Sequence, residues 1–214
     1  MRKMKNAAHS GNDELYTPAI LAESILPFVK RFKAAEKLKK PVVWCPFDTE
    51  KSEIVKALKL IGCDVFSSII KEENGNFFEK LPPAGCDIII SNPPFSAKKA
   101  VFQRLNELRV PYAMLMNYMA LGYQEIGEMF VDNPVQLIIP DKKVSFDGRT
   151  SSFNTLWVCR FFLQDRDLEF VHLENNNSRK FFKPSEMLCD SCRLCDGEAA
   201  GVDCLERRDK KCQD

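Results

Sequence analysis

Apolar and polar positions along the 214-residue chain alternate between strand-like and helix-like patterns. Short apolar runs without alternation, typical of strands covered on both faces, are followed by stretches with apolar residues at helical spacing. The expected strands are 42–45, 63–67, a short third element at 77–78, 88–91, 112–116, 135–139, 154–162 and 168–173. The expected helices are 18–28, 52–60, 97–108 and 124–130. This order predicts an α/β fold with a doubly wound, mostly parallel sheet.

Two of these helices carry capping signals. Thr17 is a candidate N-cap, with Pro18 at the first helical position. Ser52 is a candidate N-cap of the next helix, and Gly62 follows its end.

The segment after strand 88–91 is the most informative part of the chain. The apolar run stops abruptly at Asn92-Pro93-Pro94-Phe95. Two successive prolines remove two backbone donors and restrict the residue before each to extended backbone, which predicts a rigid turn. Ligands bind at this carboxyl end of the strands in open α/β sheets. A side-chain amide, free carbonyl oxygens and an aromatic ring suit the binding of a planar group that carries an NH2. The alternative is a proline-terminated strand with a core phenylalanine.

The Asn92-Pro93-Pro94-Phe95 motif resembles the catalytic motif of S-adenosylmethionine-dependent amino-methyltransferases. These enzymes methylate the exocyclic nitrogen of adenine, cytosine or guanine, or a glutamine side-chain amide. The resemblance implies that the Asn92 side-chain oxygen and the Pro93 carbonyl accept the two N–H bonds of the target amine. It implies that Pro94 stiffens the turn and that Phe95 stacks on the target. A Rossmann-like methyltransferase fold with S-adenosylmethionine as cofactor follows from the same resemblance.

Other segments extend the resemblance over roughly residues 12–173, to a small phage or prophage group similar to EcoRI-type adenine-specific methyltransferases. The acidic-aromatic-Thr-Pro stretch 12–18 and the loop 44–52 stand where such enzymes contact the cofactor. The cofactor contacts implied in this way are Tyr16, Thr17, Pro18, Pro46, Asp48, Ser52, Asn76 and Phe77.

The first cofactor loop departs from the family pattern, because no glycine follows Pro46 before Gly62. The second strand also ends without the acid that usually binds ribose hydroxyls. Either the loop is a variant of this group or cofactor binding is weak or lost. If the loop is such a variant, we expect the Asp48 carboxylate to pair with the ammonium of the cofactor. Backbone amides near Ser52 then contact the amino-acid end of the cofactor.

The formal net charge of +1 argues against a strongly basic nucleic-acid binder. Basic residues nevertheless cluster, and such clusters are either solvated faces or a rim that faces phosphates. The loop 141–152 is the candidate nucleic-acid contact, with Lys142, Lys143, Arg149, Thr150 and Ser151. No apolar run is long enough to cross a bilayer and no signal peptide is visible, so we expect a cytoplasmic protein of a bacterium or a phage-infected cell.

The chain is expected to divide into a flexible N-terminus (1–11), a Rossmann-like domain (12–175) and a Cys-rich tail (176–214). Its nine cysteines are expected to be reduced thiols or metal ligands. A set of four in the tail has the residue type for a tetrahedral zinc site: Cys189, Cys192, Cys195 and Cys204. A disordered tail with free thiols is the alternative.

The resulting expectation is methyl transfer from S-adenosylmethionine to N6 of adenine in DNA, in a single strand or flipped out of a duplex. Three alternatives remain open at this point. In the first, the substrate is tRNA or rRNA, and in the second it is a protein glutamine. In the third, the chain is a catalytically silent nucleic-acid-binding or assembly module. The sequence gives no indication of oligomeric state.

Overall fold

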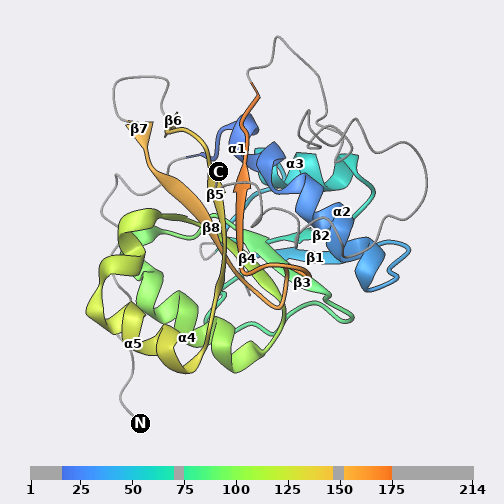
Figure 1. Cartoon of the computed structure of the whole chain (residues 1–214). Helices are drawn as coiled ribbons and strands as arrows, with labels where there is room; N and C mark the ends of the chain where they lie inside the picture. Colours follow the sequence, from blue (N-terminus) through green and yellow to red (C-terminus); the bar gives the residue numbers. More distant parts are fainter. Residues whose placement is uncertain (1–15, 70–74, 147–151, 175–214) are drawn as a thin grey trace, which may run out of the picture. The chain divides into compact units, whose positions relative to one another are not determined.

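The computed structural model of the protein describes residues 16–69, 75–146 and 152–174 (Figure 1). The predicted flexible N-terminus (1–11) and Cys-rich tail (176–214) lie outside the described residues. The helices are α1 (Ala19–Ser24), α2 (Leu26–Ala35), α3 (Glu53–Leu60), α4 (Lys98–Leu108) and α5 (Gln124–Asp132), with 3-10 helices η1 (Phe95–Ala97) and η2 (Tyr118–Gly122). The strands are β1 (Val42–Cys45), β2 (Asp64–Ser67), β3 (Ile88–Ser91), β4 (Tyr112–Asn117), β5 (Gln136–Pro140), β6 (Val144–Ser145), β7 (Ser152–Phe153), β8 (Thr155–Arg160) and β9 (Leu168–Val171).

Seven strands form one sheet in the order β2-β1-β3-β4-β8-β5-β9. Neighbouring strands are parallel except that β8 runs antiparallel to both β4 and β5. The predicted α/β, Rossmann-like class with a mostly parallel sheet is therefore confirmed. From β1 the chain moves outward to β2 and then returns to the other side of β1 to form β3. This reversal makes the space between β1 and β3 the topological switch point of the sheet, where ligands bind in folds of this kind.

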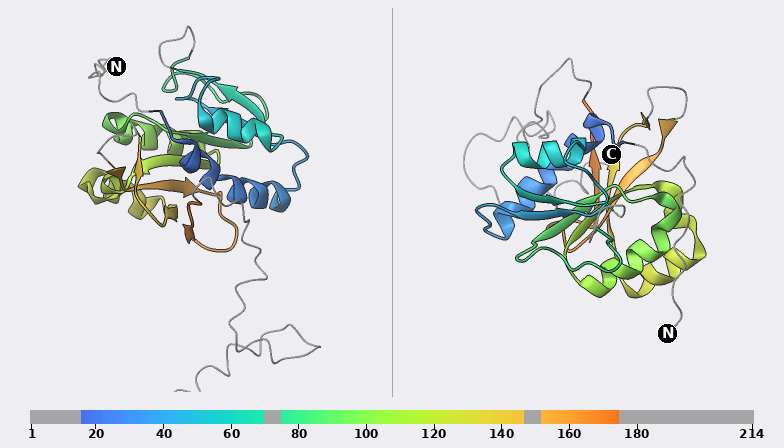
Figure 2. Two further views of the ribbon diagram at one scale, coloured as in Figure 1. Left: turned by 90° about the horizontal axis from the view of Figure 1, so that it is seen from above. Right: turned by 180° about the vertical axis from the view of Figure 1, so that it is seen from behind.

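Helices cover both faces of the sheet. α1, α2 and α3 lie on one face and α4 and α5 on the other, as the views of Figures 1 and 2 agree. Each central strand supplies side chains to two core clusters: Val43 and Ile88 pack under α1–α3, whereas Trp44 and Ile89 pack under α4–α5. Burial on both faces explains why the strand sequences are uninterrupted apolar runs.

The predicted helix 18–28 is two helices in the structure. Pro27 stands in the first turn of α2, and its missing backbone N–H prevents a continuous helix through Ile25. Pro18 occupies the N-cap position of α1, and no side chain caps this helix. The prediction of Thr17 as a cap was therefore wrong.

The predicted third element at 77–78 is a turn and not a strand. The side-chain oxygen of Asn76 accepts a hydrogen bond from the Phe78 amide at 3.1 Å, and its carbonyl accepts from Glu79 and Lys80. Two adjacent phenylalanines favour a strand, but these local hydrogen bonds bend the backbone into a turn. The short pair β6–β7, inside what the sequence indicates as a polar loop, was not predicted.

Candidate functional site

The Asn92–Phe95 corner follows β3 at the centre of the sheet. Ile88, Ile89 and Ile90 are fully buried, and the chain leaves the sheet at Asn92. Pro94 is extended, with φ −60° and ψ 125°, and η1 begins immediately after it. This backbone matches the predicted proline-stiffened turn. Asn92 is half-buried, and its side-chain oxygen lies beneath the surface.

The Asp48 carboxylate connects this corner to the loop after β1. One of its oxygens accepts from the Ser52 hydroxyl at 2.6 Å. The other accepts from the Ser91 hydroxyl and, at 3.4 Å, from the Asn92 amide. Ser91 in turn accepts from the Phe47 amide at 3.0 Å. The loop and the corner are thus hydrogen-bonded to each other at the switch point between β1 and β3.

Asp48 is almost completely buried, and burial raises the pKa of its carboxyl group even though three hydrogen bonds oppose the shift. The three donors are the hydroxyls of Ser52 and Ser91 and the amide of Asn92. A carboxylate whose oxygens already face protein donors is suited to hold the loop in place. The proposed pairing of Asp48 with the cofactor's ammonium stays a prediction.

The remaining residues of the first loop are also held by local contacts. Pro46 is buried, and Ser52 caps α3 by accepting from the Ile54 amide at 3.2 Å, which confirms the predicted N-cap. Glu50 accepts from Ser67 at the end of β2 at 2.9 Å and also binds Lys59. The carboxyl ends of β1 and β2 are therefore joined by polar side chains where the family pattern has glycines.

The predicted cofactor contacts near α1 differ in their environments. Tyr16 is 74% exposed, whereas Thr17 is 5% exposed. The Thr17 hydroxyl is buried, and among the described residues it has no hydrogen-bond partner. A buried hydroxyl without a partner is unfavourable unless a ligand or water supplies one.

Phe77, also a predicted cofactor contact, is fully buried in an aromatic cluster. Its ring centroid lies 4.9 Å from that of Phe47 and 5.5 Å from that of Trp44. Asn76, beside it, fixes the turn described above. Phe77 therefore packs against Phe47 of the first loop, and direct contact of Asn76 or Phe77 with a cofactor stays a prediction.

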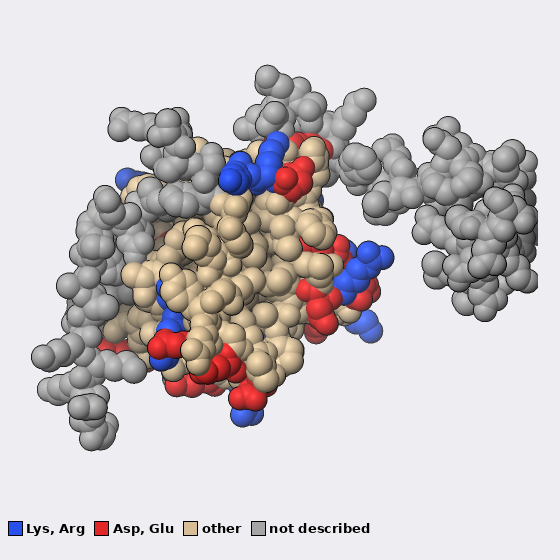
Figure 3. Space-filling view, turned by 60° about the vertical axis from the view of Figure 1, so that its left-hand side comes forward, with Lys and Arg blue, Asp and Glu red and all other residues tan. Residues whose placement is uncertain are grey.

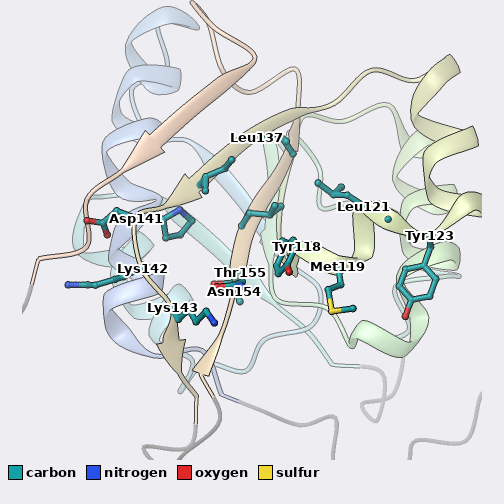
Figure 4. A pocket seen from close by; sticks show the side chains of 14 residues that line it. Tyr118, Met119, Leu121, Tyr123, Leu137, Asp141, Lys142, Lys143, Asn154 and Thr155 are labelled. Atoms are coloured by element: carbon teal, nitrogen blue, oxygen red, sulfur yellow. The ribbon is translucent and has the colours of Figure 1, made fainter.

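A cavity of about 1120 Å³ opens at the carboxyl ends of β4 and β5. Figure 4 shows Tyr118, Met119 and Tyr123 on one side of it and Lys142 and Lys143 on the other. The three apolar or aromatic side chains are each at least half exposed. None of the three was among the predicted site residues. The signal was present, because they directly follow the predicted strand 112–116 at the edge where ligands bind.

Lys98 links the corner to this cavity. Its ammonium donates to the Phe95 carbonyl at 3.4 Å and lies 4.0 Å from the ring centroid of Tyr123. A cation over an aromatic face is attracted by the ring's electrons. The contact places Tyr123 and the cavity next to the Asn92–Phe95 corner.

The predicted nucleic-acid loop lies partly in the described residues. Lys142 and Lys143 line the cavity, whereas Arg149, Thr150 and Ser151 lie outside the described residues. Asp141 is held by the Leu173 amide at 3.0 Å and by His172. On the face drawn in Figure 3, uncharged side chains fill the centre and charged ones occur in small groups.

Metal binding by the tail was predicted at Cys189, Cys192, Cys195 and Cys204, which all lie outside the described residues. Within 16–69, 75–146 and 152–174, no three His, Cys, Asp or Glu side chains form a metal-binding group. The four cysteines in this part of the chain are free thiols: Cys45, Cys63, Cys86 and Cys159. None of its helices is both long and apolar enough to span a membrane.

Comparisons with known proteins give structural similarity only. No protein-family model and no curated protein matches the sequence. A structure from Agrobacterium tumefaciens, described as a predicted O-methyltransferase, is similar with a TM-score of 0.38 and 8% identity, over 79% of this chain and 93% of that chain. The release-factor-specific protein-(glutamine-N5) methyltransferase of Alicyclobacillus acidocaldarius is similar with a TM-score of 0.32 and 15% identity, over 72% and 99% of the two chains. TM-scores and identities this low assign no function to this chain.

Proposed function

We propose that this protein is an S-adenosylmethionine-dependent methyltransferase that methylates an exocyclic amino group, and that the group is N6 of adenine in DNA. One observation carries the proposal. The Asn92–Phe95 corner and the Asp48 loop meet at the switch point of a mostly parallel sheet, joined by the Asp48–Ser91 hydrogen bond. A side-chain amide and an aromatic ring are thereby held at the position where such sheets bind ligands.

The residues around the switch point fit a cofactor with several polar groups. The buried Thr17 hydroxyl lacks a partner among the described residues. The side chains of Glu50 and Ser67 place polar atoms after β1 and at the end of β2. We assign these residues and Pro46 to cofactor binding, and Asp48 to holding the loop. When bound, S-adenosylmethionine supplies an electrophilic methyl group on a sulfonium sulfur.

The corner supplies acceptors for the target amine. An amino group on a nucleobase is a weak nucleophile, because its lone pair is delocalised into the ring. The Asn92 side-chain oxygen and the Pro93 carbonyl accept its two N–H bonds and so favour a tetrahedral, more nucleophilic nitrogen. Phe95 stacks on the ring of the base and fixes its plane. Most of the catalysis is positioning.

The cavity beside the corner supports a nucleic-acid substrate. Exposed aromatic and thioether side chains at Tyr118, Met119 and Tyr123 offer stacking surfaces, and Lys142 and Lys143 supply positive charge across from them. Stacking combined with nearby cations is typical of binding to single-stranded nucleic acid. The resemblance of segments 12–18 and 44–52 to EcoRI-type adenine-specific enzymes favours adenine in DNA within this class.

Two measurements test the proposal. Titration calorimetry with S-adenosylmethionine should detect binding, and Thr17→Val, which removes the buried hydroxyl, should weaken it about tenfold. The control Thr155→Val removes another buried hydroxyl that has no partner among the described residues, outside the candidate cofactor loop, and should leave the affinity unchanged. Absence of binding at high cofactor concentration would instead support a catalytically silent module.

Labelled methyl transfer to matched DNA and RNA oligonucleotides and a glutamine-containing peptide identifies the substrate. We expect transfer to adenine-containing single-stranded DNA, and none when the adenines are replaced by thymines. Transfer to the RNA or to the peptide alone would refute the DNA assignment while leaving the amino-methyltransferase chemistry standing.

A further inference from the structure

A second cavity, of about 320 Å³, lies at the opposite end of the sheet from Asn92. β4 begins at Tyr112 and β8 ends at Arg160, and these two residues are directly paired across the strands. Directly paired residues present their side chains on the same face of a sheet. The end of α4 completes the cavity. Its lining consists of Leu105, Asn106, Arg109, Val110, Tyr112, Asn133, Arg160 and Phe161.

The cavity is lined by hydrogen-bond donors that lack acceptors. Tyr112 is 1% exposed, and its hydroxyl has no hydrogen-bond partner in the part of the chain that the structure describes. The same holds for the buried Nε of Arg160. Donors buried in this way are unfavourable for the folded protein, so their presence on a cavity wall calls for an acceptor inside it.

The guanidinium of Arg160 is held in a fixed orientation. Its Nη1 donates to the side-chain oxygens of Asn106, at 2.7 Å, and Asn133, at 2.9 Å, and its Cζ lies 4.8 Å from the ring centroid of Phe161. The second arginine of the lining, Arg109, is exposed at the rim. No carboxylate lines this cavity, and among the described residues neither arginine forms a salt bridge. The cavity is therefore positively charged.

The backbone at both edges of the cavity is held in an unfavourable conformation. Arg109 and Phe161 each have φ 54°, in the left-handed region that non-glycine residues rarely adopt. The turn at Phe161 is fixed by Gln136, whose side-chain oxygen accepts from the Phe162 amide at 2.9 Å and the Leu163 amide at 2.8 Å. Arg109 takes this conformation as the C-cap of α4, where left-handed residues are common, whereas at Phe161 it is strain of the kind that often occurs at binding sites.

From these features we infer that the cavity between α4, β4 and β8 is a binding site for a small oxyanion, a carboxylate or phosphate group. The Tyr112 hydroxyl and the Arg160 Nε donate to it, and Arg109 closes it from the rim. The planar fork of a guanidinium group can donate two parallel hydrogen bonds to two oxygens of a carboxylate or phosphate group. The site is separate from the proposed methyl-transfer site, and its test uses no methyl transfer.

Thermal unfolding of the whole chain with increasing sodium phosphate or sodium acetate, against sodium chloride at equal ionic strength, tests this site. We expect a saturable rise in melting temperature with one of the two oxyanions. Tyr112→Phe and Arg109→Gln should each weaken the apparent affinity about tenfold, since each removes a donor to a charged group. Arg166→Gln, at an exposed arginine away from the cavity, is the matched control and should bind as the wild type does.

Tyr112→Phe has a second readout without ligand. Because it removes a buried hydroxyl that lacks a partner, the ligand-free variant should melt at the same temperature as the wild type or higher. A response to phosphate alone or to acetate alone supports the site and identifies its ligand group. A response no larger than that to chloride would mean that the cavity holds only water. Equal responses in all four proteins would mean adventitious surface binding, and either result overturns the inference.

Discussion

The Asp48 carboxylate organises the candidate site by joining segments that are distant in sequence. It accepts hydrogen bonds from Ser52 at the start of α3 and from Ser91, 43 residues away at the end of β3. Burial disfavours its charged form, which raises its pKa. The buried Asp48 carboxylate is therefore energetically unfavourable in its charged form, but its hydrogen bonds hold the loop against the Asn92 corner.

This raised pKa predicts a particular pH dependence of stability. The folded protein binds a proton at Asp48 more readily than the unfolded chain, so the free energy of unfolding should fall as pH rises from about 3.8 through the folded pKa. Glu50 and Asp141 have lowered pKa values and act in the opposite sense, but their stabilisation is complete above their ordinary values of 4.5 and 3.8.

Urea unfolding between pH 4.5 and 8 therefore tests the contribution of Asp48, and comparison with Glu50→Gln accounts for the titration of Glu50 near pH 4.5. Asp48→Asn, which keeps the shape of the side chain but cannot ionise, should remove the decline. Glu50→Gln is the control and should retain it. If the free energy of unfolding of Asp48→Asn fell with pH as steeply as that of the wild type, Asp48 would not be the group responsible.

The four cysteines of the described residues, three buried and Cys86 partly exposed, should be chemically inert in the folded protein. Burial raises the pKa of Cys63 and of Cys86 to about 11, and Cys45 and Cys159 are fully buried. The thiolate is the reactive form. Iodoacetamide labelling at pH 8 followed by mass spectrometry should modify Cys45 and Cys159 only after denaturation, and rapid labelling of the native protein would show that these strands open.

At the scale of single elements, α3 depends on its N-cap. Ser52 both accepts from the Ile54 amide and donates to Asp48, so Ser52→Ala removes a cap and one donor of a buried carboxylate. We expect the free energy of unfolding to fall by about 1–3 kcal/mol. Ser67→Ala, which removes an exposed bond to Glu50, should cost less than about 0.5 kcal/mol. Equal losses in chemical denaturation of the two variants would argue against the cap.

The sequence predicts the elements whose local pattern agrees with their environment. Strand 88–91 is recognisable because three isoleucines are buried on both faces, and the corner after it because two prolines fix its backbone. The element at 77–78 was mispredicted because the Asn76 side chain, and not the strand propensity of two phenylalanines, sets the backbone there. The break at Ile25 depends on a single proline in an otherwise helical stripe.

Much of the candidate site depends on contacts that no local pattern records. The bond between Asp48 and Ser91 and the contact of Lys98 with Tyr123 each bring together segments that are separate in sequence. The resemblance selected Asp48 as a cofactor ligand, whereas the fold directs its carboxylate toward Ser52 and Ser91. Tyr118 and Tyr123 follow a predicted strand, but only the fold shows that both are exposed and that Tyr123 lies beside the corner, through Lys98.

At the scale of the whole molecule, the two core clusters share the same strands and should unfold together. The two tryptophans report on them separately, since Trp44 packs under α4–α5 and Trp157 under α1–α3, and both are fully buried. In Trp44→Phe and Trp157→Phe, each with one remaining tryptophan, the fluorescence midpoint in urea should coincide with the circular dichroism midpoint of the same variant. Separate midpoints would mean that the two faces of the sheet are independent.

Methyl transfer by Asn92 variants tests the central claim most directly. The substrate is a single-stranded adenine-containing oligonucleotide with labelled S-adenosylmethionine, and folding of each variant is checked by its melting temperature. Asn92→Ala should reduce the rate about 10²- to 10³-fold, because an acceptor for the target amine is lost. Asn92→Asp, which keeps acceptor oxygens, should retain more activity than Asn92→Ala. A folded Asn92→Ala variant that transfers methyl groups at the wild-type rate would contradict the account.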